Sequence, residues 1–322
     1  MAAVCASLFV PVLLGGAEAL RAAFSFPARA YPLILCAVGA SWLCRALKLQ
    51  LLLERLAPHH GFAATLAVSL AAEFGFAATP AGIGGYAASV YYLRRAGATS
   101  SGAAAITAAD QMLDLLFFAL ALPLAALMLP ATAVPAGIFG LLRWTCAATF
   151  LCLCLAWLAR GPLHTWLCAA SVGAPGRLQG LHDTARRHLA ALCADAVVAM
   201  RGGPVFLCAL LGLTALQWIA RYGVLWLVLA ALGSPASFAA VFLLQAFVLH
   251  AAQWTGVPAG AGAVEVGIGA ALFTSMPAVD IAAGLLVWRA ATVYAILAAG
   301  ALAIVWLSRR PVGGAASAVS AG

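Results

Sequence analysis

Eight ionisable side chains stand in or at the edge of long apolar runs of this 322-residue sequence, and they are the residues best placed to do chemistry. They are Glu73, Asp110, Asp114, Arg143, Arg221, His250, Glu265 and Arg289. An ionisable group kept away from water is unfavourable unless it is paired or hydrated, so such groups are functional candidates. The chemistry that they could perform is the binding of a charged group inside an otherwise apolar protein.

Glu265 and Arg289 suggest one ion pair. Arg289 lies about nine residues into the apolar run that follows Glu265, so a hairpin packed on that run would bring the two side chains together. We expect this pair to form a polar site for a headgroup or for a charge that moves. The alternative is a structural ion pair that locks the hairpin.

Asp110 and Asp114 are four residues apart and share one face of a helix. We expect them to be the counterpart of Glu265 in the first half of the chain, with Glu73 nearby. The alternative is that they cap or pair with Arg94 or Arg95 near the inner membrane surface.

The elements that position these charges are predicted to be transmembrane helices. Of the 322 residues, 66% are hydrophobic and 8% are charged, whereas about 25% of an average soluble domain is charged. A helical crossing needs about 20 apolar residues, which leaves room for at most about ten spans. The runs are continuous, unlike the alternating segments of about ten residues in an outer-membrane barrel. The fold class is therefore all-α, a polytopic helical membrane protein.

The apolar runs fall near residues 3–20, 30–53, 62–79, 82–93, 103–129, 136–159, 204–231, 238–256, 262–275 and 281–307. Six of these runs are long enough for full spans, the first of them weakly. The segments 62–93 and 238–275 are each broken by Pro and Gly in mid-run, and their second limbs are too short for an upright crossing. We predict two re-entrant hairpins in a single membrane domain, residues 1–322.

The two breaks share a motif. Residues 80–84 read P-A-G-I-G and residues 258–262 read P-A-G-A-G, so Pro80 corresponds to Pro258. Each broken segment is followed by a long helix, so residues 62–129 and 238–307 are predicted to be the cores of two inverted repeats. Unwound backbone at membrane depth is tolerated where it is buried in protein or lines a cavity, as in secondary transporters. The candidate substrate-binding residues of the breaks are Pro80, Gly82, Pro258, Gly260 and Gly262.

The basic residues predict the orientation. If the polar stretch 160–203 is cytoplasmic, twelve basic residues, Arg45 and Lys48 among them, fall on the inner side against two, Arg21 and Arg29, outside. The C-terminus, with a disordered tail at 308–322, is then cytoplasmic. The helical spacing of leucines between residues 178 and 192 predicts an amphipathic helix on the inner leaflet, or else an ordinary connector helix.

Several classes of function lack their motifs. The formal charge of +8 has no polar, base-contacting domain to accompany it, which argues against nucleic acid. The sequence has no GxxxxGK[ST], HExxH or GxSxG motif, and its nine cysteines form no CxxC pair. We expect no enzymatic activity, no cofactor and no metal.

The second half resembles the lysylphosphatidylglycerol synthase transmembrane-region family. The segment 257–265, followed by Trp288, Arg289 and Tyr294, is similar to that family's pattern P-x-G-x-G-x-x-E, then R-x-x-x-x-Y. The resemblance adds Tyr294 to the candidate substrate-binding residues. The first half departs from its pattern, because Tyr86 stands in place of Glu and Gln111 in place of Arg, although Asp114 matches.

The resemblance implies a lipid-handling protein of a bacterial-type inner membrane. Family members with a C-terminal aminoacyltransferase domain synthesise aminoacylated phosphatidylglycerol, and we expect this chain to be a stand-alone member without that domain. It would move an amphiphilic lipid, of phospholipid, aminoacyl-phospholipid or isoprenoid type, between leaflets. The alternatives are a non-transporting subunit that scaffolds a lipid-biosynthesis enzyme and, third, a membrane-embedded transferase. Its partners would be membrane lipids, with a biosynthetic enzyme or a second copy of the chain as further candidates.

Overall fold

The computed structural model describes residues 2–56, 61–129, 202–309 and a few positions between 191 and 199, and within these ranges every regular element is helical. The predicted all-α class is therefore confirmed. The predicted span at 136–159, most of the loop 160–203 with its amphipathic helix, and most of the tail 308–322 lie outside the described residues.

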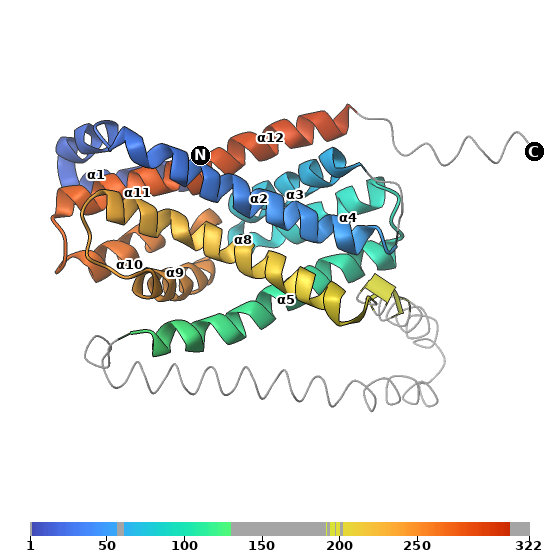
Figure 1. Ribbon diagram of the computed structural model, residues 1–322. Helices are drawn as coiled ribbons and strands as arrows, with labels where there is room; N and C mark the ends of the chain where they lie inside the picture. Colours follow the sequence, from blue (N-terminus) through green and yellow to red (C-terminus); the bar gives the residue numbers. More distant parts are fainter. Residues whose placement is uncertain are drawn as a thin grey trace, which may run out of the picture.

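The first half of the chain begins with two long helices, continues with a broken hairpin and ends with a third long helix (Figure 1). Its elements are α1 (Ala2–Phe24), α2 (Tyr31–Leu53), α3 (Phe62–Ala78), the short 3₁₀ turn η2 (Pro80–Gly82), α4 (Ile83–Arg95) and α5 (Ser100–Leu127). Helix α1 is bent at Gly16, whose φ is 63°.

The second half repeats this order from its long helix onward. Its elements are α8 (Gly203–Ala231), α9 (Phe238–Gln253), the 3₁₀ turn η5 (Pro258–Gly260), α10 (Ala263–Leu272), α11 (Ala278–Arg289), the π-helical turn η6 (Ala290–Tyr294) and α12 (Ala295–Ser308). A π-turn inserted into a helix is rare and occurs often at functional sites.

Four helical segments in the described ranges are long and apolar enough to cross a membrane: Ala28–Leu53, Ser100–Leu127, Gly203–Ala231 and Ala278–Ser308. Each coincides with a predicted full span. The hairpin limbs are shorter, as the Pro and Gly breaks require. The total of six full spans stays a prediction.

The two halves are related by a single offset along the chain. The offset that pairs Pro80 with Pro258, at the starts of η2 and η5, also pairs the last residues of α2 and α8 and the first residues of α5 and α11. The packing is reciprocal: α3 packs on α12 while α9 packs on α5, and α2 and α8 pack on each other. Equivalent contacts of this kind indicate a two-fold relationship.

The direction of the helices makes the repeats inverted. In Figure 1, α2 runs from left to right and its counterpart α8 from right to left, and α5 and α11–α12 are likewise opposed. The hairpins α3–α4 and α9–α10 lie toward opposite ends of the bundle, and their 3₁₀ turns η2 and η5 meet between them. These opposed directions are the ones that inverted repeats require, and the bounds of the two repeats stay a prediction.

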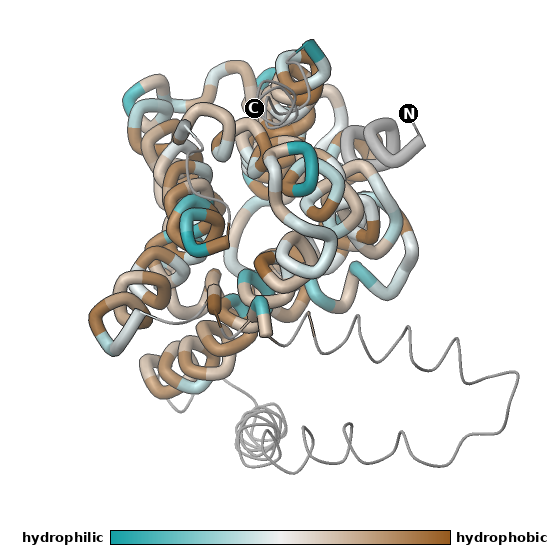
Figure 2. Tube along the Cα trace, turned by 90° about the vertical axis from the view of Figure 1, so that its right-hand side faces the viewer, coloured by the Kyte–Doolittle hydropathy of each residue, from teal (hydrophilic) through white to brown (hydrophobic). Residues whose placement is uncertain are grey.

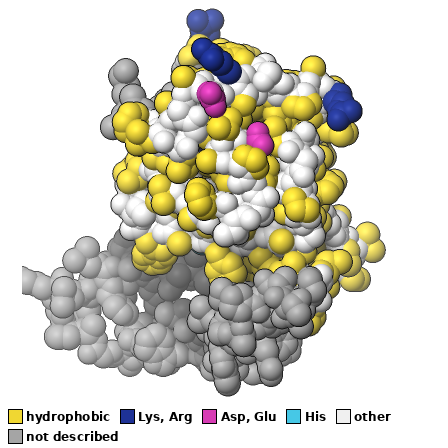
Figure 3. Space-filling view, turned by 90° about the vertical axis from the view of Figure 1, so that its left-hand side faces the viewer, with side chains coloured by type: hydrophobic (Ala, Val, Ile, Leu, Met, Phe, Trp, Pro, Cys, Tyr) yellow, Lys and Arg dark blue, Asp and Glu magenta, His cyan; other side chains and the backbone are white. Residues whose placement is uncertain are grey.

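The surface of the bundle is that of a membrane protein. Apolar residues cover most helical turns in Figure 2, and hydrophilic residues occupy scattered positions. The end of the molecule shown in Figure 3 carries mostly hydrophobic side chains with few charged ones. Large side chains such as Phe24, Val205, Leu127 and Trp254 are exposed, which suits contact with lipid rather than with water.

Candidate functional site

A cavity of about 440 Å³ lies where the two broken hairpins meet. Both breaks contribute backbone to its wall, at Ala81 and Gly82 in η2 and at Ala259 and Gly260 in η5. Helices α3, α5, α8, α9 and α11 supply most of the remaining side chains. Irregular backbone that lines a cavity at membrane depth is the arrangement expected of a secondary-transporter site.

The second-half wall is built on the predicted ion pair, which the structure confirms. Arg289 Nε donates to Glu265 Oε1 at 2.7 Å, and both side chains are buried, with exposures of 2% and 0%. Glu265 stands in the first turn of α10, where its Oε2 accepts the N–H of Gly262 at 2.7 Å. Arg289 Nη1 donates to the carbonyl of Ala259 at 3.1 Å. The pair therefore ties α11 to the second break.

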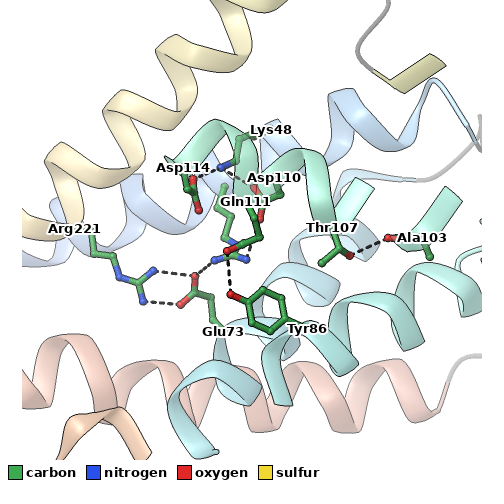
Figure 4. Close-up of polar contacts among 10 residues, drawn as sticks. Lys48, Glu73, Tyr86, Ala103, Thr107, Asp110, Gln111, Asp114 and Arg221 are labelled. Atoms are coloured by element: carbon green, nitrogen blue, oxygen red, sulfur yellow. Dashed lines mark hydrogen bonds and ion pairs between the residues drawn. The ribbon is translucent and has the colours of Figure 1, made fainter. Parts of the chain in front are cut away.

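The first-half wall rests on a buried charge network that starts at α2 (Figure 4). Lys48 Nζ lies 2.7 Å from Asp110 Oδ1 and 2.8 Å from Asp114 Oδ1. Arg45 Nη2 donates to Asp110 at 3.1 Å, and Arg45 Nη1 pairs with Glu73. Arg45 and Lys48 are one helical turn apart, so one face of α2 binds the acids of both α3 and α5.

The network crosses into the second half through Arg221 of α8. Its two Nη atoms donate to the two carboxylate oxygens of Glu73 at 2.9 and 2.6 Å, a forked geometry visible in Figure 4. Forked arginine–carboxylate pairs are strong and fix the orientation of both groups. The Arg221 side chain is 31% exposed, faces the cavity and lies 5.5 Å from the ring centroid of Trp218.

Gln111 is the first-half counterpart of Arg289, and it contacts Tyr86. The repeat offset pairs Gln111 with Arg289, and the Tyr86 hydroxyl donates to Gln111 Oε1 at 3.3 Å (Figure 4). A neutral side chain thus stands in the first half where the second half has Arg289, while the offset pairs Glu265 with Ala87.

Three buried donors on the cavity wall have no hydrogen-bond acceptor within the described part of the chain. They are Nη2 of Arg289, Nε1 of Trp288 and Nε1 of Trp218. Leaving a buried donor unsatisfied costs about 1–3 kcal/mol, and these three donor atoms are themselves buried although their residues line the cavity. Among the described residues, no group of three or more His, Cys, Asp or Glu is placed to hold a metal ion.

Residues 1–300 match the family described as lysylphosphatidylglycerol synthase TM region. The chain belongs to this family. A comparison with curated proteins gave no match. Together with the membrane-spanning helices, the match makes the protein a multi-pass membrane protein of a family concerned with lipid metabolism.

The candidate residues of this lysylphosphatidylglycerol synthase TM region chain divide into two groups. Gly82, Gly260, Asp114 and Arg289 line the cavity. The others lie outside the cavity lining, in the two breaks, α5, α10 and η6: Pro80, Pro258, Gly262, Glu265, Asp110 and Tyr294. Their individual roles stay predictions.

Two sequence-based interpretations are wrong. The charge pattern assigns Arg45 and Lys48 to the basic residues of the inner membrane surface, but both are buried and bind the acids of α3 and α5. The suggested partners Arg94 and Arg95 of Asp110 and Asp114 are replaced by this pair on α2, because α2 packs between α3, α5 and α8.

Without Arg45 and Lys48, ten basic residues remain on the predicted inner side, so the predicted orientation of the chain in the membrane does not change. Glu73 and Arg221 stand among the embedded charges of the sequence but outside its predicted site residues. The sequence does contain a signal for Arg45 and Lys48 as embedded charges, since they stand three residues apart within the apolar run 30–53.

Proposed function

We propose that the protein moves an amphiphilic lipid between membrane leaflets without changing it chemically. The headgroup would occupy the cavity at the meeting point of the two breaks, while the acyl or isoprenoid tails stay in the bilayer. A lipid needs only its headgroup shielded, so a cavity of about 440 Å³ between hairpins and helices is of a suitable size.

The observation that carries this proposal is the cavity itself, which lies between the two breaks and is lined by charged side chains of both halves, Asp114, Arg221 and Arg289 among them. Inverted repeats with broken helices allow the two halves to rock about a central site, which is how alternating access works in transporters.

Some of the candidate residues would contact the lipid headgroup, and others would position the residues that do. Arg289 and Asp114, with the backbone at Gly82 and Gly260, would contact the headgroup. Glu265 is a positioning residue, since it holds Arg289 from behind. No cofactor or metal is needed for this function, and the partner that it requires is a membrane lipid.

The charge distribution supports a bacterial-type inner membrane with a cytoplasmic C-terminus. The right-hand end of the bundle in Figure 1, where α2, α4 and α12 end, carries Arg55, Arg94, Arg95 and Arg309. The opposite end has Arg21 and Arg29 near the α1–α2 connection. Basic residues concentrate on the cytoplasmic side of such membranes.

The test is lipid exchange between leaflets of proteoliposomes, measured with fluorescent phosphatidylglycerol and a fluorescent neutral lipid. Wild type is compared with Glu265→Gln and Arg289→Gln, and with Glu54→Gln as a matched control on the exposed end of α2. We expect exchange by wild type and by the control, and its loss in both cavity variants that still fold. Folding is checked by thermal unfolding and gel filtration.

The opposite outcomes are equally clear. Wild type that exchanges no lipid would contradict the proposal and favour the scaffold alternative, as would full activity in both cavity variants. Glu265→Asp separates the two functions further, because a scaffold should tolerate it while a transporter should lose exchange. Chemical conversion of the lipid by the purified protein would favour the transferase instead.

A further inference from the structure

We infer that the lipid enters the cavity sideways from the bilayer, through an opening between α5 and the last turn of α9, and that an aromatic wall inside this opening binds the carbons next to the headgroup. The wall consists of the rings of Phe118, Trp218, Tyr222 and His250. This inference rests on the proposed function, since it names the entrance and a second binding surface of the same cavity.

The lining residues that are exposed all come from one side of the cavity. They belong to η2, α4, α5 and α9, and they are Ala81, Tyr86, Leu115, His250 and Gln253. In the part of the chain that the structure describes, the lining residues of α2, α3, α8, α11 and η6 are all buried or half-buried. The cavity therefore opens where these five exposed residues lie, and they form its mouth.

The mouth lies at mid-depth of the bundle. Tyr86 stands in the first turn of α4, directly after the first break, whereas His250 and Gln253 stand in the last turn of α9, directly before the second. Leu115 lies near the middle of α5, a helix long enough to cross the membrane. The broken helices of transporters meet near the bilayer midplane. The mouth thus faces the hydrocarbon core of the bilayer.

The mouth is partly polar, which a purely lipid-facing surface would not be. Tyr86, His250 and Gln253 have polar side chains and are exposed at this depth. Polar and ionisable groups at membrane depth are unfavourable against hydrocarbon, and they occur where they border a cavity or a pathway. These three side chains therefore mark a passage for a group that is itself partly polar.

The aromatic wall lies directly inside the mouth, with Phe118 of α5 at its centre. The centroid of the Phe118 ring lies 5.3 Å from that of His250 and 4.7 Å from that of Trp218. Tyr222 completes the wall, with its ring centroid 5.7 Å from that of Phe118. Packed rings offer a large apolar surface, which suits the carbons of a lipid better than a hydrated solute.

The charged part of the cavity begins where the aromatic wall ends. Trp218 marks the boundary, because the Arg221 guanidinium lies 5.5 Å from its ring centroid and is itself paired with Glu73. The lining thus changes from rings to charges. A lipid whose headgroup reaches the charges would place its first carbons against the rings, while the rest of its tails pass through the mouth and stay in the bilayer.

The route is tested by photochemical labelling of the full chain in proteoliposomes, with a phosphatidylglycerol that carries a diazirine on the acyl carbons nearest the glycerol. Surrounding lipid labels any exposed residue, so the decisive position is Phe118, which is only 8% exposed. We expect labelling at Phe118 and none at Phe242, which is buried in the same aromatic cluster but lies outside the cavity lining. Labelling confined to lipid-exposed residues such as Leu120 would overturn the inference.

Bulky side chains at the mouth test the entrance. In Leu115→Trp/Gln253→Trp an indole stands on each side of the mouth, and both lipid exchange and labelling of Phe118 should fall at least about fivefold. The matched control is Leu120→Trp/Phe247→Trp, at exposed positions of the same two helices outside the cavity lining. Equal effects in the two folded variants would overturn the inference. If the mouth variant does not fold, the labelling of wild type decides.

A water-soluble substrate is the competing occupant of this cavity. Dioctanoyl phosphatidylglycerol and glycerol 3-phosphate are compared on the purified full chain in a neutral detergent, by the rise in unfolding temperature. We expect the lipid to act at a concentration at least about tenfold lower, since burial of two methylene groups alone is worth about this factor. Equal action of the two compounds would overturn the inference, because the aromatic wall would then contribute nothing.

The outcomes separate this inference from the proposed function. Labelling of Phe118 in a protein that exchanges no lipid between leaflets would refute transport and keep the entrance. Exchange that persists in the mouth variant, without labelling of Phe118 in wild type, would keep transport and refute the entrance. Exchange and labelling that fall together in the mouth variant support both.

Discussion

The break after α3 and the break after α9 begin with the same turn, but they continue differently and are stabilised by different contacts. Helix α4 starts directly at Ile83, whereas the non-helical Ala261 and Gly262 separate η5 from α10. Ala81 and Ala259 both have φ 52°, in the left-handed region that non-glycine residues rarely occupy. In the first break, Thr79 Oγ1 donates to the carbonyl of Gly75 and accepts the N–H of Gly84, each at 2.8 Å. A neutral hydroxyl therefore closes this turn from within its own hairpin.

The second break has Val257, which has no hydroxyl, at the position that corresponds to Thr79, directly before the proline. The hydroxyl of Thr255 accepts the N–H of Val257 at 3.3 Å and so acts before the proline. The fastening of the second break after the proline is the charged pair: Arg289 holds the carbonyl of Ala259, and Glu265 holds the N–H of Gly262. The helix that supplies Arg289 also changes to a π-turn at the next residue, whereas α5 is α-helical throughout.

In the first half, different residues stabilise the break and connect the two halves of the protein. Because Thr79 fastens the first break, the first-half acids are free to join the network through Arg45 and Arg221 that connects the halves. In the second half, one arginine both fastens the break and faces the cavity. A ligand that accepts from Arg289 therefore acts directly on the second break and only indirectly on the first.

The largest effect should come from Arg45→Gln. This substitution leaves Glu73 and Asp110 without a shared buried cation, and breaking a buried pair costs about 3–5 kcal/mol. The unfolding temperature in detergent should fall sharply, whereas Arg55→Gln, at the exposed end of α2, should leave it nearly unchanged. Similar unfolding temperatures for the two variants would show that the network contributes little to stability.

The pair Tyr86→Glu and Gln111→Arg tests whether the halves are interchangeable. Together the substitutions give the first half the charge types of Glu265 and Arg289, whereas each alone adds an unpaired charge beside the cavity. A double-mutant cycle on the free energy of unfolding should give a favourable coupling of about 0.5–3 kcal/mol. Zero coupling would mean that the first-half site cannot hold an ion pair, whatever its residues.

Substitutions at Thr79 and Val257, the equivalent positions before the two prolines, should have a smaller effect on stability. Thr79→Val removes the hydroxyl that satisfies the N–H of Gly84 and should cost about 1–3 kcal/mol. Hydrogen exchange at the start of α4 should accelerate in step. Val257→Thr should change stability by less than about 1 kcal/mol, because Arg289 and Glu265 already fasten that turn. Equal losses of stability in Thr79→Val and Val257→Thr would contradict the view that the two breaks are stabilised by different contacts.

The smallest expected effects come from Ala81→Gly and Ala259→Gly. Glycine relieves the positive φ at these positions, and the relief exceeds the entropy that glycine adds to the unfolded chain. We expect each variant to be more stable by about 0.5 kcal/mol, measured by thermal unfolding. A clear loss of stability at either position would show that the alanine methyl group packs usefully there.

The sequence predicts local features of this fold well. Pro80 and Pro258 with their glycines mark the breaks because those residues interrupt helices whatever their surroundings. The pairing of Glu265 with Arg289 was also predictable, since a single hairpin connects them. Both depend on neighbours in the chain.

The partners of Asp110 and Asp114 were not predictable in the same way. Arg45 and Lys48 lie far earlier in the chain, and only the packing of α2 against α5 brings them together. Their position toward the inner end of α2 also fits a side chain that reaches the membrane surface. The repeat offset locates Gln111 opposite Arg289 but not its partner Tyr86, because the offset pairs Glu265 with Ala87.

The buried charges have a further consequence for the energetics of transport. The network and the second-half pair contain four cations, Arg45, Lys48, Arg221 and Arg289, and four acids, Glu73, Asp110, Asp114 and Glu265. Because these formal charges cancel, the membrane potential does no net work on the group if it moves as one body. The potential would act on the headgroup alone. With the cytoplasm negative, a singly anionic headgroup would be favoured toward the outer leaflet by about 2.3 kcal/mol per 100 mV.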